Sequence, residues 1–171
     1  MKILVSKITL KGNLTKNSLG HLARQISFYK ENINKGLDLG IEELIMKLYD
    51  IVIRNCKENN ITLHHQYIYA EYDKKSNIGR VWTDNIVIIF NEFGTGINGI
   101  QDAWANFFDY KVNLSGKGLK GWYFHNEEHN YEGITHGIMS KHMFINALKE
   151  IQKDIPNNIE VSISRTAGRM Y

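Results

Sequence analysis

Histidine and carboxylate side chains gather in one short stretch of the C-terminal half, at His125, Glu127, Glu128, His129 and His136. Two histidines four residues apart can bind one zinc ion together with a carboxylate when a helix presents them on one face. The residues around them, Asn-Glu-Glu and Asn-Tyr-Glu-Gly, are typical of a turn, and the order HExxH is absent. We therefore expect no metal site. A small metal-dependent hydrolase or nuclease using His125, Glu128, His129 and His136 remains the alternative.

A second pattern, Gly94-x-Gly96-x-x-Gly99, has the spacing of the dinucleotide-binding fingerprint. That fingerprint requires a helix directly after the glycines and a second parallel βαβ unit. Residues 100–104 lack a helical apolar stripe, and no such unit follows. We expect no bound nucleotide and no other cofactor.

The single cysteine, Cys56, excludes an internal disulfide and a multi-cysteine zinc site. A reactive thiol needs an activating partner, which the sequence does not identify, so we interpret Cys56 as a packing residue. No serine lies in a nucleophile-elbow context. These observations predict a chain that is not an enzyme.

Aromatic and lysine side chains are dense between residues 104 and 122. Such a mixture suits either a nucleic-acid backbone or a subunit interface. The net charge of the 171-residue chain is only +3, which is too small to argue for nucleic acid. We favour an interface with another subunit or partner, formed by the turn after residue 91 and the aromatic residues: Glu92, Phe93, Gly94, Thr95, Gly96, Trp104, Phe107, Phe108, Tyr110 and Trp122.

The longest periodic segment runs from about Thr15 to Asn59, with apolar residues three or four apart. This spacing predicts one long amphipathic helix with Thr15 as its N-cap. Gly36 and Gly40 each weaken a helix by about 1 kcal/mol, so a bend near residues 34–40 is compatible with the pattern.

The rest of the chain alternates in shorter segments. Ser140 is expected to cap a second helix over residues 141–153, which Pro156 would end, and Asp84-Asn85 is expected to be a hairpin turn. Strands are predicted over residues 2–11, 62–72, 78–83, 86–93, 121–125 and 159–164, and residues 165–171 are expected to be a loose tail.

These elements predict one α+β domain over residues 1–171. Its mainly antiparallel sheet, with a meander through residues 62–93, would be packed by one long N-terminal helix and one shorter C-terminal helix. The first residues lack a cleavage pattern typical of a signal peptide, and no apolar run is long enough for a transmembrane helix.

Three segments resemble, in order, a tail-component family of tailed bacteriophages, the head–tail joining, neck or tail-completion proteins of lambda-like phages. Residues 89–96 (IFNEFGTG) are similar to the family's "YVEFGTG" hallmark, and residues 121–123 (GWY) to its tryptophan strand. Thr135-His136-Gly137-Ile138 with Phe144 to Leu148 is similar to its passage into the last helix.

The resemblance implies a structural virion protein rather than a catalyst. It implies a ring of about six copies at the head-proximal end of a phage tail or of a headless tail-like particle. Its partners would be itself and the flanking connector and tail-tube or tail-terminator proteins, with DNA only as cargo through the lumen. Such a protein is assembled in the host cytoplasm and resides in the particle.

Overall fold

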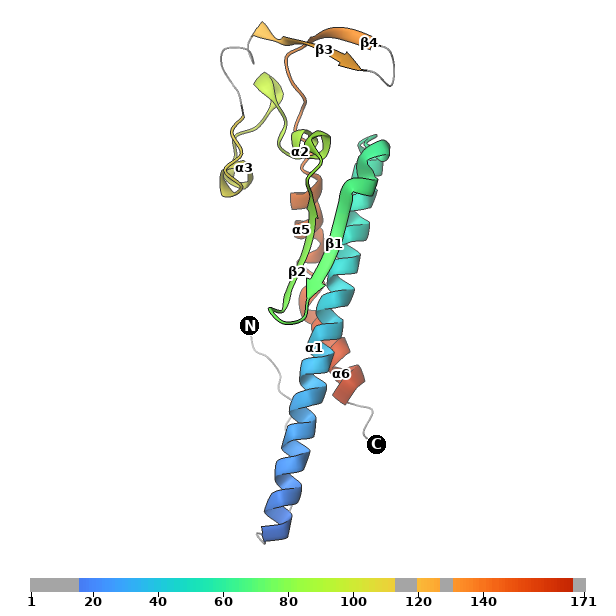
Figure 1. The fold of residues 1–171 in the computed structure, drawn as a ribbon, viewed down its shortest axis with the longest axis vertical. Coiled ribbons are helices and arrows are strands. Elements are labelled where there is room, and N and C mark those ends of the chain that lie inside the picture. The colour runs from blue at the N-terminus through green and yellow to red at the C-terminus, as the bar shows by residue number, and fades with distance from the viewer. Residues whose placement is uncertain (1–15, 113–119, 127–130, 168–171) are drawn as a thin grey trace.

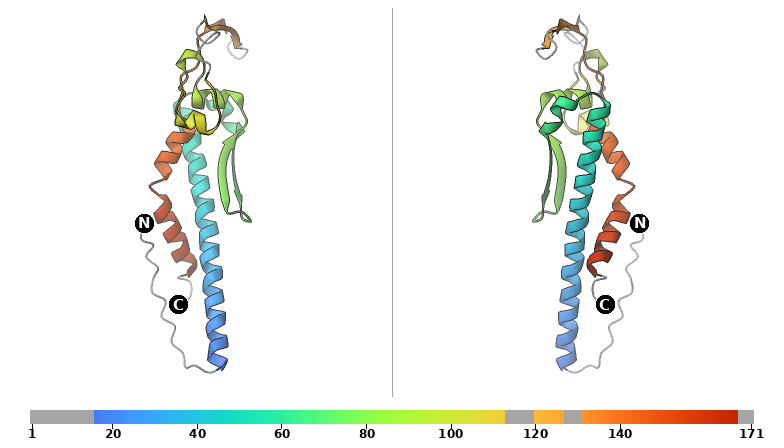
Figure 2. Two further views of the ribbon diagram at one scale, coloured as in Figure 1. Left: turned by 90° about the vertical axis from the view of Figure 1, so that its left-hand side faces the viewer. Right: turned by 90° about the vertical axis from the view of Figure 1, so that its right-hand side faces the viewer.

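A computed structural model describes residues 16–112, 120–126 and 131–167 (Figure 1). Helix α1 (Lys16–Glu58) forms the long axis of the molecule, with a β-hairpin along one side and helices α5 (Met143–Ile151) and α6 (Ile155–Ala167) along another (Figure 2). The predicted α+β class, with a long N-terminal helix packing against antiparallel strands and a shorter C-terminal helix, is confirmed. The predicted strand over residues 2–11 and the cap Thr15 lie outside the described residues.

Helix α1 is unbroken through both of its central glycines. A Cβ on Gly36 would lie 2.5 Å from Thr166 Oγ1 and 2.7 Å from Ile163 Cα, and one on Gly40 would lie 3.0 Å from Ile159 Cδ1. The glycines therefore mark the close approach of α6 rather than a break in α1.

We expect Gly36→Ala to lower the free energy of unfolding by about 1–3 kcal/mol, because the added methyl group meets backbone atoms of α6. The matched control is Gly20→Ala on the same helix, where no atom lies within 4 Å. The control should be neutral or stabilising by up to about 1 kcal/mol, as alanine favours the helix. Urea unfolding of the two variants measures the difference; equal effects would contradict the close packing.

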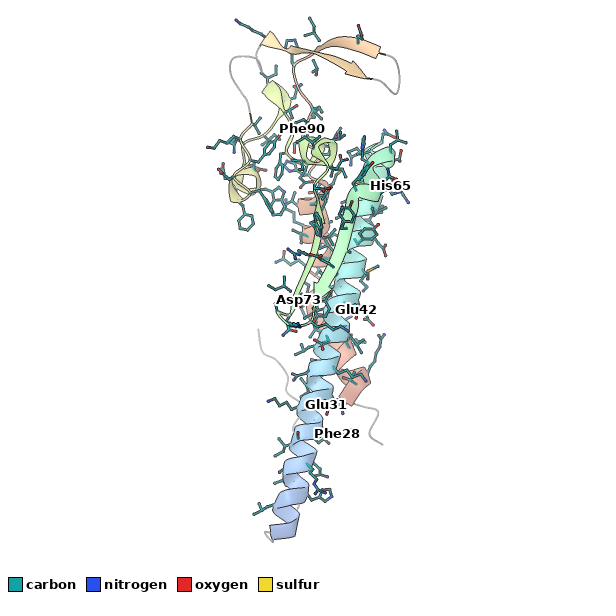
Figure 3. The ribbon with its side chains drawn as sticks, in the orientation of Figure 1. Phe28, Glu31, Glu42, His65, Asp73 and Phe90 are labelled. Atoms are coloured by element: carbon teal, nitrogen blue, oxygen red, sulfur yellow. The ribbon has the colours of Figure 1, made fainter. Side chains whose placement is uncertain are left out.

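Strands β1 (Ile68–Asp73) and β2 (Ile78–Thr83) form an antiparallel hairpin that pairs Tyr69 with Trp82. Residues 74–77 form the turn between the strands, where Asp73 accepts hydrogen bonds from Lys75 N (2.9 Å) and Ser76 Oγ (2.7 Å). Figure 3 labels Asp73 at this turn, close to α1. The strand predicted from residue 62 is too long, because Thr62–Tyr67 forms a 3₁₀ turn, η1.

The prediction of a buried strand over residues 86–93 is wrong, and so is the three-stranded meander. Residues Ile86–Phe93 form helix α2. Asn85 is its N-cap and not part of a hairpin turn, since its side-chain oxygen accepts from Val87 N (3.0 Å) and Ile88 N (3.3 Å). Gly94 ends the helix with a positive φ of 75°. A good N-cap before the apolar run Ile86–Phe90 thus selects the helix.

The predicted strand over residues 159–164 is also wrong, because this segment belongs to α6. Pro156 lies in the first turn of α6, where a missing N–H costs little, and so it begins a helix rather than ending one. The predicted loose tail is corrected in part, as α6 continues to Ala167.

The contact between α6 and α1 includes polar bonds in addition to the approach of Ile159 and Ile163 to the two glycines. Asn158 accepts from Lys47 Nζ (3.1 Å), Arg165 pairs with Glu43 (3.1 Å), and Thr166 Oγ1 donates to Asn32 O (2.9 Å). Asn158 and Ser162, one turn apart, are both buried. The side of α6 that faces α1 therefore contains polar residues, which hides its helical period from a search for apolar residues.

The remaining strands form a second hairpin of β3 (Trp122–Asn126) and β4 (Tyr131–Thr135). The strand predicted over residues 121–125 is confirmed with a shift of one residue. The hydrophobic core lies where α1, η1, β1, α2 and α5 meet, and its buried members are Val52, Cys56, Ile61, Ile68, Ile88, Met143 and Ala147.

Candidate assembly site

Glu92, near the end of α2, is almost fully buried at 3% exposure, and its carboxylate caps another helix. Oε2 accepts from Phe144 N (2.8 Å), and Oε1 accepts from Ile145 N (3.1 Å) and from the indole N–H of Trp104 (2.8 Å). His142, at the N-cap position of α5, is left-handed and provides no side-chain cap. Glu92 therefore satisfies N–H groups that the local sequence leaves unpaired, at the helix end that favours negative charge.

Main-chain atoms of residues 92–95 also form hydrogen bonds with residues 138–140, which lead into α5. The Glu92 carbonyl accepts from Ser140 Oγ (2.6 Å), so Ser140 does not cap the helix as predicted. Thr95 N donates to Ile138 O (2.8 Å), and Ile138 N donates to Thr95 Oγ1 (2.9 Å). His142 N also donates to the Glu92 carbonyl (3.3 Å), so five residues, Glu92, Thr95, Ile138, Ser140 and His142, join segments 92–96 and 138–145 in addition to the cap.

Two glycines lie where the main chains of these two segments come so close that a side chain would not fit. Gly94 has φ 75°, and a Cβ there would lie 2.8 Å from both Ile138 O and Ser140 N. Gly137, on the facing segment, has φ 128°, and its Cβ would lie 1.8 Å from Thr95 O. The glycine–threonine turn is therefore an internal junction between α2 and α5.

An aromatic patch, defined as Trp104, Phe107 and Phe108, projects from this junction on helix α3 (Ala103–Phe107). Phe108 packs edge-on against Trp104 and Phe107, with ring centroids 4.7 and 5.0 Å apart. Phe107 is 77% exposed and Phe108 is 54% exposed. Because Trp104 is hydrogen-bonded to Glu92, the patch is fixed to the junction.

Tyr110 and Gln101 close the segment that carries the patch. The Tyr110 ring stacks on Phe93 at 4.7 Å, and its hydroxyl donates to Gly94 O (3.0 Å). The Gln101 side chain donates to Tyr110 O (2.8 Å) and accepts from Val112 N (2.8 Å). Residues 101–112 are therefore a closed loop with its own hydrogen bonds.

The structure divides the predicted interface residues into two groups. Glu92, Phe93, Gly94 and Gly96 are buried, and Thr95 is bonded to Ile138, so these act within the chain. Phe107 and Phe108 remain exposed, and Trp104 and Tyr110 are partly buried. The side chain of Trp122, on β3, lies outside the described residues. The predicted interface residues did not include Ile138, His142, Phe144 and Ile145, whose contributions are mostly main-chain bonds that residue type does not reveal.

The structure does not bring the histidine cluster together as a described site. Glu127, Glu128 and His129 lie outside the described residues; His125 lies on β3, and His136 is exposed before Gly137. Among the described residues, no group of three His, Cys, Asp or Glu side chains could hold a metal ion.

We expect Cys56 to react slowly with thiol reagents. Burial, aided by the charge of Glu92, raises the pKa of its thiol to about 11. At pH 8 the folded protein should react at least about 100-fold more slowly with an aromatic disulfide reagent than the urea-unfolded chain. The pKa of the Cys56 thiol is higher in the folded protein than in the unfolded chain. The contribution of the protonated thiol to the free energy of unfolding is therefore complete below pH ~8.5 and is lost as the pH rises toward 11. Comparable rates in both states would contradict this burial.

No protein-family model, no curated protein and no solved structure matches this chain. None of the helices in the described part of the chain is both long and apolar enough to cross a membrane.

Proposed function

We propose that the chain is a structural assembly protein of a phage tail or tail-like particle. In this proposal it is the ring-forming neck or tail-completion subunit that joins or caps the head-proximal end of the tail. The observation that carries the proposal is the aromatic patch, whose two phenylalanines are largely exposed and whose Trp104 is hydrogen-bonded to Glu92 of the junction. An exposed apolar patch with polar surroundings is typical of a protein–protein contact.

The junction also supports the proposal through the resemblance. The segment similar to the family hallmark, residues 89–96, and the segment similar to its last-helix passage are the two that the Glu92 cap and the Thr95–Ile138 bonds join. A ring subunit needs a rigid body that presents its contact surface in one orientation, because closure depends on the angle between neighbours. The partners would be sister copies, in a ring that we propose to be a hexamer, and the flanking connector and tail-tube proteins. Its location would be the particle.

Negative-stain images and the solution mass of the purified full chain test the proposal. We expect closed rings with a mass of about six copies, since a closed ring uses every heterologous contact. A monomer at all concentrations, or stoichiometric zinc or manganese with a hydrolytic activity that His129→Ala removes together with the metal, would overturn it in favour of the alternative hydrolase.

We expect the double variant Phe107→Asp, Phe108→Asp to require at least about tenfold more protein to form rings, because charge at the centre of an apolar contact is costly to bury. The control is Ile78→Asp on β2, which is also exposed, at 58%. The control should assemble like the original chain. Unchanged ring formation by the double variant, measured by light scattering after size exclusion, would show that the patch is not the contact.

A further inference from the structure

One face of α1 continues beyond the helix that covers it. Helix α6 lies against α1 at Gly36 and Gly40 and ends near Asn32, whose carbonyl accepts from Thr166 Oγ1 (2.9 Å). The N-terminal turns of α1 extend past this point, with no other described element beside them (Figures 1 and 2). Gly40 lies about two turns after Ile33, so the apolar residues of these N-terminal turns continue the face that α6 covers. We call them the N-terminal stripe: Leu19, Leu22, Ile26, Tyr29 and Ile33.

The described elements leave this stripe largely exposed. The side chains of Leu19 and Ile26 are 50% and 52% exposed, and that of Ile33, next to the end of α6, is 37% exposed. A row of apolar side chains on one face of a helix is typical of a face that packs against another segment. The occupant must be able to reach the stripe and must carry apolar residues at a matching spacing.

The residues directly before α1 meet the first condition. Lys16 is the first described residue, three positions before Leu19, so the preceding chain is joined to the free end of the stripe. Gly12-Asn13 suits a reversal of direction there, because glycine and asparagine accept the positive φ values that tight turns need. Within the strand predicted over residues 2–11, aliphatic residues are frequent: Ile3, Leu4, Val5, Ile8 and Leu10.

The spacing of these aliphatic residues matches that of the stripe. At about 1.5 Å per residue, α1 rises about 21 Å from Leu19 to Ile33. At about 3.3 Å per residue, an extended segment spans about 23 Å from Leu10 back to Ile3. In this reversed direction four pairs agree to within about 2 Å along the axis: Ile3 with Ile33, Val5 with Tyr29, Ile8 with Leu22, and Leu10 with Leu19.

The fifth residue of the stripe, Ile26, falls in the gap between Val5 and Ile8 in this register. Side chains alternate along an extended chain, so one irregular residue at Ser6 or Lys7 is needed to place Val5 and Ile8 on the same side. A bulge of one residue has this effect. The break in the alternation of residues 2–11 thus lies where the stripe presents Ile26.

We propose that residues 3–10 form an extended strap that lies antiparallel along the N-terminal stripe of its own α1. The short connection favours the chain's own strap over that of a second copy, because it gives a high effective concentration. The strap covers the apolar residues of the projecting turns and leaves the aromatic patch available for the contact between copies. The inference concerns one copy and does not depend on the proposed ring.

Pairs of cysteines joined by a short thiol-specific cross-linker test the position of the strap in the full chain. Val5→Cys with Tyr29→Cys should be linked within one copy at least about fivefold faster than Val5→Cys with Phe28→Cys. Phe28, labelled in Figure 3, is 50% exposed and lies on a different face of the projecting turns, so it is the matched control. The native Cys56 is buried and should not compete.

Amide exchange of α1 tests the cover itself. Ile8→Asp should accelerate exchange at residues 22–30 at least about tenfold, because a charge on the apolar side of the strap weakens its contact with the helix. Thr9→Asp places the same charge on the opposite side of the strap and should leave these rates unchanged.

Three results would overturn the inference. Cross-linking mainly between two copies would place the strap on a neighbour, and equal rates for the two cysteine pairs would show that it has no fixed position. Unchanged exchange in Ile8→Asp would assign the stripe to another cover, such as residues 168–171. None of these results concerns the aromatic patch, so the proposed function would stand; a monomeric chain would overturn the ring and leave the strap standing.

Discussion

Glu92→Ala is expected to lower the free energy of unfolding by about 3 kcal/mol, the largest effect of any single side-chain removal at the junction. The change leaves the N–H groups of Phe144 and Ile145 and the indole N–H of Trp104 without their acceptor. Buried donors left unpaired cost about 1–3 kcal/mol each, and partial hydration of the cavity offsets some of this. Urea unfolding measures the loss, and amide exchange at residues 144 and 145 should accelerate with it.

Two further variants test whether the hydrogen bonds of the Glu92 side chain, and not its negative charge alone, stabilise the protein. Glu92→Gln keeps one acceptor oxygen but places an N–H₂ group toward one of the bonded donors, so a smaller loss of about 1–2 kcal/mol is expected. Glu31→Ala removes an exposed carboxylate from α1 and should change stability by less than about 0.5 kcal/mol. If Glu92→Ala is as mild as Glu31→Ala, the cap does not hold α5.

Gly137→Ala is expected to destabilise the protein by at least about 3 kcal/mol. The new Cβ would lie 1.8 Å from Thr95 O and 3.0 Å from Gly96 Cα, and the φ of 128° disfavours any side chain. The segment must therefore move away from Thr95 and lose the bonds between Thr95 and Ile138.

The midpoint of urea unfolding measures this loss, with Gly20→Ala as the control in open space. A near-neutral result would show that residues 136–140 can shift without disturbing the junction. If the variant folds, the aromatic patch should also lose its fixed orientation, which near-ultraviolet circular dichroism of Trp104 and its neighbours reports.

The spacing of apolar residues correctly predicted the elements that have one apolar face. The stripe of α1 repeats over many turns, so two glycines could not obscure it, and β2 is short and bounded by turn residues. The helix near residue 145 was also found, although its first residue is Met143 and not the one after Ser140. In α5 and in the C-terminal half of α1, one apolar face meets the core that contains Val52 and Met143, which is the condition under which spacing reports structure.

The spacing of apolar residues gave the wrong element where a helix is apolar on every side or buries polar residues. The run Ile86–Phe90 is apolar on every side, so its period cannot separate strand from helix, and Asn85 decides. In α6, Asn158 and Ser162 are buried among polar groups of α1, and the remaining Ile159, Val161 and Ile163 alternate by coincidence.

By itself the sequence determined the long helix, the α+β class and the segment around Glu92 and Gly94 as the feature to examine. Only the tertiary structure decided that this segment is an internal junction and that Phe107 and Phe108 are what it exposes. The physical reason is that a carboxylate capping a helix about fifty residues away leaves no local pattern. Its partners are main-chain N–H groups, which every residue type except proline carries.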